Sequence, residues 1–193
     1  MRLSHPRVLP LEVSDWSEET AATLSRFNRP ESPGGGRILN IFKTLAHHPK
    51  LLKRWTVFAN HILFKSTLPA RDREILILRI GWLCQAEYEW GQHVVIGKRE
   101  GLSDEDISRI AEGSDSVGLD PFEATLLRAA DELHADAMLS DTTWSALSAR
   151  YTTQQLIDLV FTVGQYNLVS MALNTLGVQL DEGIPGFADG AAA

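Results

Sequence analysis

Apolar residues recur three and four positions apart along most of this chain, which is the spacing of one face of an α-helix. No stretch alternates apolar and polar residues in the way that a half-buried strand requires. The pattern therefore predicts an all-α fold, a compact bundle of about seven or eight helices with short connections. The clearest stripe lies in residues 49–65 and consists of Leu51, Leu52, Trp55, Phe58, Ala59, Ile62 and Leu63.

Residues that favour the first turn of a helix mark where several of these helices begin. Pro49 and Pro121 suit the first helical position, because the N–H group that proline lacks would have no partner there. Ser103 and Asp106 have the spacing of a capping box. We expect helices at residues 15–27, 37–45, 49–65, 69 onward, 103–112, 121 onward, 142–151 and 152 onward.

Composition divides the chain into three parts. The segment NRPESPGGG, residues 28–36, is typical of a loop. Its three glycines do not indicate a phosphate site, because no strand precedes them and the Gly-Lys-Ser/Thr ending of a phosphate loop is missing. We expect an N-terminal extension with one short helix over residues 1–36, a helical domain over 37–183 and a tail over 184–193.

The charge and the cysteine content exclude several classes of protein. A net charge of −7 argues against binding to nucleic acid, which needs a dense basic patch, and against binding to an anionic membrane surface. The single cysteine rules out a disulfide within the chain. The first residues contain no apolar segment typical of a secretory signal. We expect a cytoplasmic protein that binds neither nucleic acid nor membranes.

The residues that can carry chemistry gather in one stretch, RDREILILRIGWLCQAEYEWGQHVVIGKREG. Glu89 lies one helical turn before His93, where a carboxylate raises the pKa of an imidazole and fixes which ring nitrogen carries the proton. Glu74 reaches the same site only if the helix breaks in between, and we expect this break around Cys84 and Gln85. The stretch therefore predicts a helical hairpin with its turn near the site.

Three segments carry a family resemblance, LPARDREILILRIGWLCQAEYEWGQHVVIGKREGLS, LAHHPKLLKRW and IDLVFTVGQYNLVSMALNTLGV. They resemble the carboxymuconolactone decarboxylase and alkylhydroperoxidase D-like superfamily over roughly residues 37–180. The resemblance implies an alkylhydroperoxidase D-like bundle built around the central helical hairpin. It also implies a homo-oligomer, a dimer, trimer or hexamer, with sites near the subunit interfaces.

The peroxidase branch of this family has a Glu, two cysteines spaced C-x-x-C, and a His four residues later. On this chain the Glu corresponds to Glu74 and the His to His93, but the two cysteine positions are Ala86 and Glu89. Peroxide reduction in that branch requires both thiols, one to attack and one to resolve the product. Cys84 lies two residues before the first position and has no resolving partner, so we interpret it as a buried apolar cysteine.

The decarboxylase branch keeps a His with a Glu four residues before it, and Glu89 and His93 match that pattern. We expect a cofactor-free acid/base enzyme, a decarboxylase, lyase, hydratase or isomerase that acts on a small carbonyl or lactone metabolite. In this hypothesis His93 is the general acid/base and Glu89 orients it. Glu74 is a second proton carrier or an electrostatic stabiliser. A metal bound by these three residues is not expected, because the resemblance implies none.

Several other residues are candidates for contact with the substrate. Trp82, Tyr88, Trp90 and Cys84 lie beside the acid/base residues in the sequence and could line a pocket for an apolar or ring substrate. Aromatic residues at helical spacing are more often part of the core. Tyr166, like the asparagines that follow it, interrupts an apolar helix, so it either faces the pocket or satisfies buried polar groups.

Two other functions are also compatible with the sequence. One is a thiol-dependent alkylhydroperoxidase-like antioxidant or redox protein that uses Cys84, which would need an accessible thiolate. The other is a non-catalytic, oligomeric binding member of the family. A structure without a cavity beside His93 would favour this last interpretation.

Overall fold

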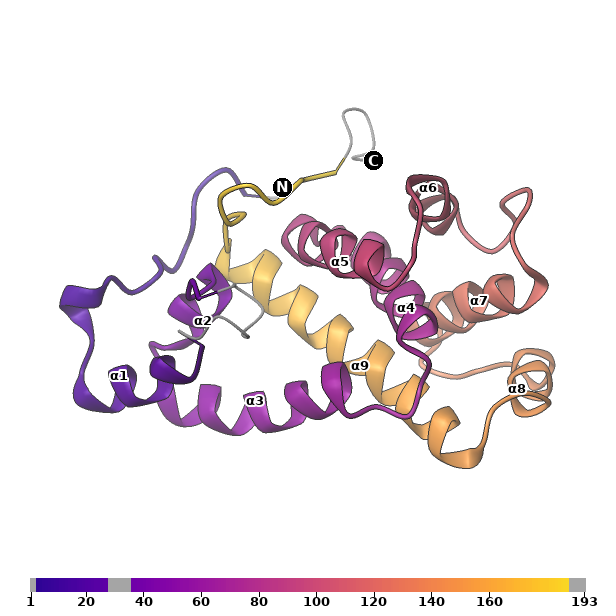
Figure 1. The fold of residues 1–193 in the computed structure, drawn as a ribbon, viewed down its shortest axis with the longest axis horizontal. Helices are drawn as coiled ribbons and strands as arrows, with labels where there is room; N and C mark the ends of the chain where they lie inside the picture. The colour runs from indigo at the N-terminus through magenta and orange to yellow at the C-terminus, as the bar shows by residue number, and fades with distance from the viewer. Residues whose placement is uncertain (1–2, 28–35, 188–193) are drawn as a thin grey trace.

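The computed structural model describes residues 3–27 and 36–187, and within them it is all-helical, with no strand (Figure 1). This confirms the predicted fold class. Most of the loop predicted over residues 28–36 lies outside the described residues. The α-helices are α1 Glu18–Leu24, α2 Asn40–Leu45, α3 Pro49–Phe64, α4 Ala70–Leu83, α5 Glu87–Arg99, α6 Asp104–Glu112, α7 Pro121–Ala135, α8 Asp141–Ser148 and α9 Thr153–Leu176.

The described part of the chain thus has nine α-helices rather than seven or eight, and the predicted start signals hold at most of them. Pro49 and Pro121 occupy the first turns of α3 and α7, and Ser103 forms the predicted capping box with Asp106. The helix predicted over residues 15–27 is shorter. Its α-helical part starts at Glu18, because the Ser17 side chain accepts the Thr20 N–H and caps it there.

Helix α4 lies at the centre of the molecule, in contact with α5, α6, α7 and α9, and ten consecutive residues of it are buried. Helix α9 crosses the molecule behind it (Figure 1). By length and composition alone α9 could cross a membrane, but 56% of its most apolar window is buried inside the protein. The core helix of a globular protein has the same properties, and α9 packs as such a helix.

The core contains charged residues as well as apolar ones, and every charged side chain of α4 has a hydrogen-bond or ion-pair partner. Asp72 accepts a hydrogen bond from the Tyr151 hydroxyl at 2.5 Å. The Arg79 guanidinium donates to Asp131 on α7 and to the carbonyl oxygens of Ile110 and Ala111 at the end of α6. A buried charge is tolerated only when it is paired in this way.

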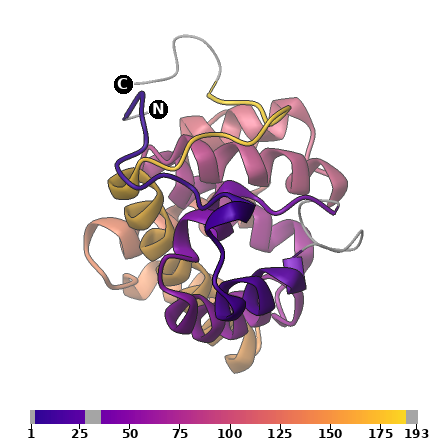
Figure 2. The ribbon, with the colours of Figure 1, turned by 90° about the vertical axis from the view of Figure 1, so that its left-hand side faces the viewer.

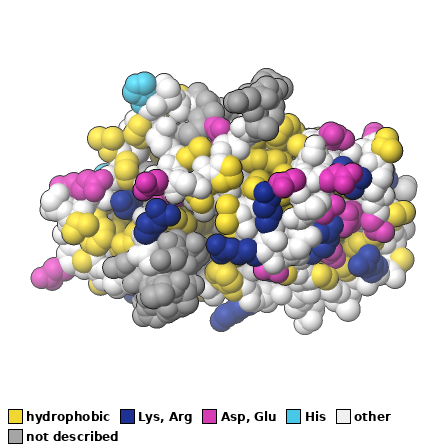
Figure 3. Space-filling model, turned by 45° about the horizontal axis from the view of Figure 1, so that its top comes forward, with side chains coloured by type: hydrophobic (Ala, Val, Ile, Leu, Met, Phe, Trp, Pro, Cys, Tyr) yellow, Lys and Arg dark blue, Asp and Glu magenta, His cyan; other side chains and the backbone are white. Residues whose placement is uncertain are grey.

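Helices α1–α3 form one side of the molecule and α6–α8 the other (Figure 1). The N-terminal segment runs across the α1–α3 side (Figure 2) and is tied to the end of α9, where the backbone N–H groups of Arg7 and Val8 both donate to the carbonyl oxygen of Leu176. On the face shown in Figure 3, Lys and Arg side chains are interspersed with Asp and Glu side chains.

The predicted break between α4 and α5 is present and has a definite geometry. Gln85 adopts a left-handed conformation with φ of 51°. The N–H of Ala86 donates to the carbonyl oxygen of Gly81, and the N–H of Gln85 donates to that of Trp82, both at 2.9 Å. These two bonds form a Schellman motif, the usual end of an α-helix, with glutamine in the position that glycine normally takes. The two helices therefore fold back into a hairpin.

The beginning of the predicted tail, residues 184–187, is packed against this hairpin. The backbone N–H of Phe187 donates to Glu87 at 3.1 Å, and its ring packs against Trp82 and Trp90. Gly91 on α5 makes this approach possible, because a Cβ atom there would lie 2.1 Å from the carbonyl oxygen of Pro185. This part of the chain belongs to the packed fold.

The hairpin turn generates a first prediction. A non-glycine residue in the left-handed region costs about 1–2 kcal/mol, and a β-branched residue is disfavoured most. We expect the free energy of unfolding to decrease in the order Gln85→Gly, wild type, Gln85→Val, with about 1–2 kcal/mol between the two variants. Denaturant unfolding measures this order, and Gln154→Val at an exposed helical position is the control. Equal stability of the Gly and Val variants would contradict the proposed role of the turn.

Candidate active site

The helical hairpin brings together the three residues that the sequence singles out. Glu74 comes from α4, and Glu89 and His93 come from α5. The ring nitrogen Nδ1 of His93 lies 2.6 Å from Glu74 Oε2, and Nε2 lies 3.0 Å from Glu89 Oε1. All three side chains are buried, with Glu74 fully so. The imidazole is thus held between two carboxylates, one on each side of the ring.

The surroundings of the ring favour its charged form. Burial by itself lowers the pKa of His93, but the Coulombic attraction of Glu74 and the hydrogen bonds to Glu74 and Glu89 outweigh it and raise this pKa to about 9. At neutral pH the ring is therefore an imidazolium that donates from both nitrogens. Glu74 also pairs with Arg73 at 3.1 Å, so two cations and two carboxylates balance within the buried cluster.

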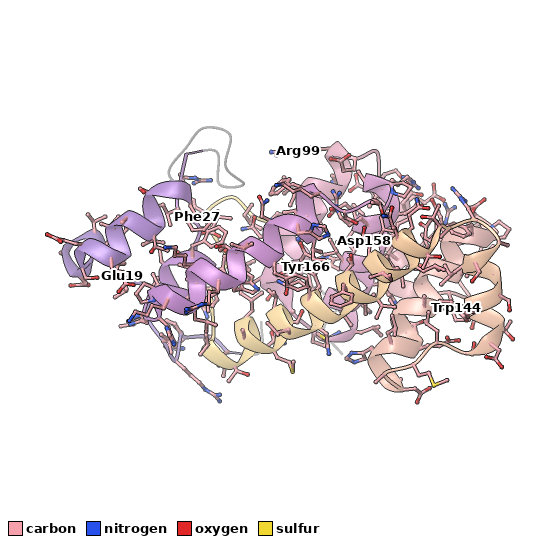
Figure 4. All side chains as sticks on the ribbon, turned by 90° about the horizontal axis from the view of Figure 1, so that it is seen from below. Glu19, Phe27, Arg99, Trp144, Asp158 and Tyr166 are labelled. Atoms are coloured by element: carbon pink, nitrogen blue, oxygen red, sulfur yellow. The ribbon has the colours of Figure 1, made fainter. Side chains whose placement is uncertain are left out.

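A cavity of about 770 Å³ lies beside this cluster, between α2, α3, α5 and α9. Glu89 and His93 form part of its wall, whereas Glu74 lies behind them and does not. Within the described residues, Glu89 Oε2 has no hydrogen-bond partner. Tyr166 on α9, in the middle of the molecule in Figure 4, packs against His93 with the two rings nearly perpendicular and 4.9 Å between their centroids. The site therefore offers one free carboxylate oxygen beside a fixed cation.

The residues predicted to contact a substrate divide into two groups. Tyr88 lines the cavity, where its hydroxyl donates to Asp181 at 2.5 Å. Trp82 and Trp90 do not line it, because their rings pack with Phe187 elsewhere on the hairpin. The predicted substrate contacts of these two tryptophans are therefore not supported at this cavity.

Cys84 is also absent from the cavity wall, and only 9% of its surface is exposed. Its thiol donates to the Asn167 side-chain oxygen at 3.0 Å and lies 3.9 Å from His134 Nδ1. Its carbonyl oxygen accepts a hydrogen bond from the Asn174 amide at 2.8 Å. The two asparagines thus satisfy polar groups around the end of α4. A role of Cys84 in binding a substrate at this cavity is not supported either.

The structure adds polar residues that the sequence did not single out. Gln92 lines the cavity and is fixed by donating to Asp181 at 2.9 Å. Gln165 precedes Tyr166 on α9, and both line the cavity. Because α9 is apolar on most of its faces, its periodicity gives no signal for which polar residue points inward.

The described residues contain no group of three His, Cys, Asp or Glu side chains arranged to hold a metal ion. In the Glu74, His93 and Glu89 cluster both imidazole nitrogens already face carboxylates, so neither offers a lone pair to a cation.

Comparison with known proteins agrees with the fold. Residues 49–132, which include the whole hairpin, match the family model described as the carboxymuconolactone decarboxylase family. Over these residues the chain matches that family, and its fold is that of the alkylhydroperoxidase D-like structures. No curated protein matches its sequence.

Several solved structures share the superfamily fold at low sequence identity. A peroxidase-related protein from Ralstonia eutropha JMP134, described as an alkylhydroperoxidase AhpD core, is 18% identical with a TM-score of 0.78, over 93% of this chain and 95% of that one. A peroxidase-related protein from Silicibacter sp. TM1040 is 14% identical with a TM-score of 0.79, over 94% and 96%. The debrominase Bmp8, in complex with 2,3,4-tribromopyrrole, is 17% identical with a TM-score of 0.72, over 93% and 94%.

The charge state of His93 generates a second prediction. Because its pKa is raised from 6.5 to about 9, the stabilisation is complete below pH 6.5 and is lost as the pH rises through 9. We expect this loss to reach roughly 3 kcal/mol of unfolding free energy, at 1.36 kcal/mol per pKa unit. An NMR titration of the His93 ring protons measures the pKa, with His93→Gln to assign the signal. A midpoint near 6.5 would contradict the paired imidazolium.

Proposed function

We propose that this chain is a cofactor-free acid/base enzyme that acts on a small carbonyl or lactone compound. The observation that carries the proposal is the His93 imidazolium, held between Glu74 and Glu89 at the wall of a large cavity. Titratable groups that are paired, buried and next to a cavity are typical of acid/base sites.

In this proposal Glu89 is the base. Its free oxygen removes a proton from the carbon next to the substrate carbonyl, and the C–H electron pair moves toward the carbonyl oxygen to give an enolate. The His93 imidazolium stabilises the developing negative charge, as a preorganised cation does in a site of low dielectric constant. The proton on Glu89 then returns to another carbon, which completes an isomerisation, or goes to a leaving group, which completes an elimination.

These roles differ from the expectation in which His93 is the base and Glu89 orients it. A ring with a pKa of about 9 already holds its second proton at neutral pH, so it cannot accept another one. Glu74, which has no access to the cavity, then takes the orienting role through Nδ1. Its effect on the reaction is indirect.

The thiol-dependent alternative has less support. The chain has one cysteine, and Cys84 is buried outside the cavity wall. The peroxidase-related names of two neighbours describe those proteins, and peroxide reduction by two thiols requires a second cysteine that this chain lacks. A structure without a cavity beside His93 would have favoured the non-catalytic alternative, and a cavity is there.

A third prediction tests the acid/base proposal by hydrogen exchange. In D₂O the wild-type protein is expected to catalyse deuterium uptake at the acidic C–H positions of 2-acetylnaphthalene or γ-butyrolactone, followed by NMR. Glu89→Gln is expected to lower the rate by about 10²–10⁴-fold, the usual contribution of a positioned base. His93→Gln is expected to lower it by about 10²–10³-fold, the usual contribution of one electrostatic stabiliser. Glu87→Gln changes a carboxylate on the same helix that does not line the cavity and is expected to keep the rate. No uptake above buffer with either probe, or full rates in the first two variants, would refute the proposal.

The same experiment separates the thiol alternative. Cys84→Ala is expected to keep the exchange rate, and Cys84 in the wild-type protein is expected to resist labelling by dimedone after exposure to peroxide. Labelling of Cys84 together with loss of activity in Cys84→Ala would favour thiol chemistry instead.

We also propose that the chain forms a homo-oligomer through the outer side of α9. Ile157, Phe161, Leu168 and Met171 are each more than half exposed and lie along this long core helix. Phe161 contacts Phe58 of α3, itself 37% exposed, with 6.0 Å between the ring centroids, so the apolar surface continues onto a second helix. A surface of this kind is typical of contact between protein subunits.

A fourth prediction follows from this surface. Light scattering is expected to show more than one copy per particle for the wild-type protein and a single copy for Phe161→Glu, because burying an unpaired carboxylate is costly. Val117→Glu, at a 91% exposed residue outside α9, is expected to leave the assembly unchanged. A monomeric wild-type protein would contradict the proposal.

A further inference from the structure

Several polar groups of residues on the cavity wall have no hydrogen-bond partner within the described residues, among them Trp55 Nε1, Glu89 Oε2 and the side chains of Gln165 and Tyr166. The side chain of Gln165 is 5% exposed and that of Tyr166 is 7% exposed, and both line the cavity. Within the described residues, neither the Gln165 amide nor the Tyr166 hydroxyl has a hydrogen-bond partner. Their polar atoms are accessible from the open space of the cavity, so a ligand bound there can supply the missing hydrogen-bond partners.

Both side chains can donate to the same kind of ligand atom. The Gln165 amide carries two N–H donors and the Tyr166 hydroxyl carries one O–H donor. Burial, and then the nearby charges of Glu89 and Glu74, raise the pKa of Tyr166 well above its usual value, so its hydroxyl stays protonated. A neutral carbonyl oxygen accepts two hydrogen bonds and matches this pair.

The charges on the cavity wall argue against an anionic ligand. They are Glu89 and His93, which pair with each other, His61, which pairs with Asp158 at 3.5 Å, and Lys65, which is exposed at the end of α3. The wall contains no arginine among the described residues. A carboxylate bound deep in the cavity would be buried near Glu89 without a cation of its own, which is unfavourable.

The remaining wall is apolar and the cavity is large. Aromatic rings contribute much of it, from Phe27, Phe42, Trp55, Phe64 and Tyr88 together with Tyr166. Phe64 and Val57 also line the cavity, yet they are 62% and 70% exposed, so the apolar surface continues to the outside along α3. A volume of about 770 Å³ lies in the upper part of the range for drug-sized ligands.

We propose that the cavity binds an uncharged, largely apolar carbonyl compound with more than one ring, whose carbonyl oxygen accepts hydrogen bonds from Tyr166 and Gln165. This assignment rests on the proposed acid/base function. Hydrogen bonds to the carbonyl oxygen make the neighbouring C–H group more acidic, so that Glu89 can remove its proton. Tyr166 and Gln165 are then catalytic residues that touch the substrate. Two donors on the carbonyl stabilise the oxygen of the enolate more than that of the ketone.

Three matched probes test this inference by calorimetry: 2-acetylnaphthalene, which has a neutral carbonyl, 2-naphthoate, which has a carboxylate on the same ring system, and naphthalene, which has no oxygen. We expect the ketone to bind at least tenfold more tightly than the carboxylate. Tyr166→Phe and Gln165→Leu are each expected to weaken ketone binding about tenfold, the effect of one lost hydrogen bond, and to leave naphthalene binding unchanged. Gln154→Leu, an exposed position on α9, is the control.

Several outcomes would overturn the inference. They are tighter binding of 2-naphthoate than of the ketone, equal losses for the ketone and naphthalene in Tyr166→Phe, and no binding of any probe up to its solubility limit. Binding is also measured in Glu89→Gln, which is expected to retain the ketone. Ketone binding without hydrogen exchange would therefore refute the proposed function and leave this inference intact. Hydrogen exchange with the lactone, without tighter binding of the ketone than of the carboxylate, would refute this inference and leave the proposed function intact.

Discussion

The site depends on one interaction, the pairing of a buried imidazolium with a carboxylate on each side. Two carboxylates that share a buried site repel each other, and the imidazolium between Glu74 and Glu89 offsets this repulsion, together with Arg73 on the far side of Glu74. The ring in turn is charged because the two carboxylates, Glu74 first, outweigh the effect of burial on its pKa. The three residues therefore form a unit, and the hairpin that brings α4 against α5 is the structural requirement for it.

One member of this unit, Glu89, stands at one of the two positions that the resemblance to the peroxidase branch assigns to thiols, and Ala86 stands at the other. Ala86 is fully buried at the start of α5, and Glu89 takes the second position and pairs with His93. At that position a thiol can be oxidised, whereas the Glu89 carboxylate can accept a proton. The scaffold is shared with proteins called peroxidase-related and with a debrominase, so the fold alone does not determine the chemistry.

The sequence predicted the features that depend on local spacing. The break near Gln85 follows from the requirement that Glu74 reach residues on the next helix, and the capping residues set several helix ends. The positions of Trp82 and Trp90 were not predictable, because an aromatic side chain on a buried helix has the same periodicity whether it faces a cavity or the core. Their partner Phe187 lies about a hundred residues further along the chain, and no local pattern indicates such a contact. The inward direction of Gln165 is hidden for a similar reason, since α9 is apolar on nearly every face.

The paired charges on α4 have a consequence for how the whole bundle is aligned. Asp72 accepts a hydrogen bond from Tyr151, which follows α8, and Arg79 donates to α7 and to the end of α6. Contacts with three separate parts of the chain therefore fix the rotation of α4 about its own axis. A slip of one residue would turn α4 by about 100° and unpair these contacts at once, whereas the apolar side chains around it would still find apolar neighbours. Hydrophobic burial holds the helices together, and these few polar contacts select a single register among the many that burial alone would allow.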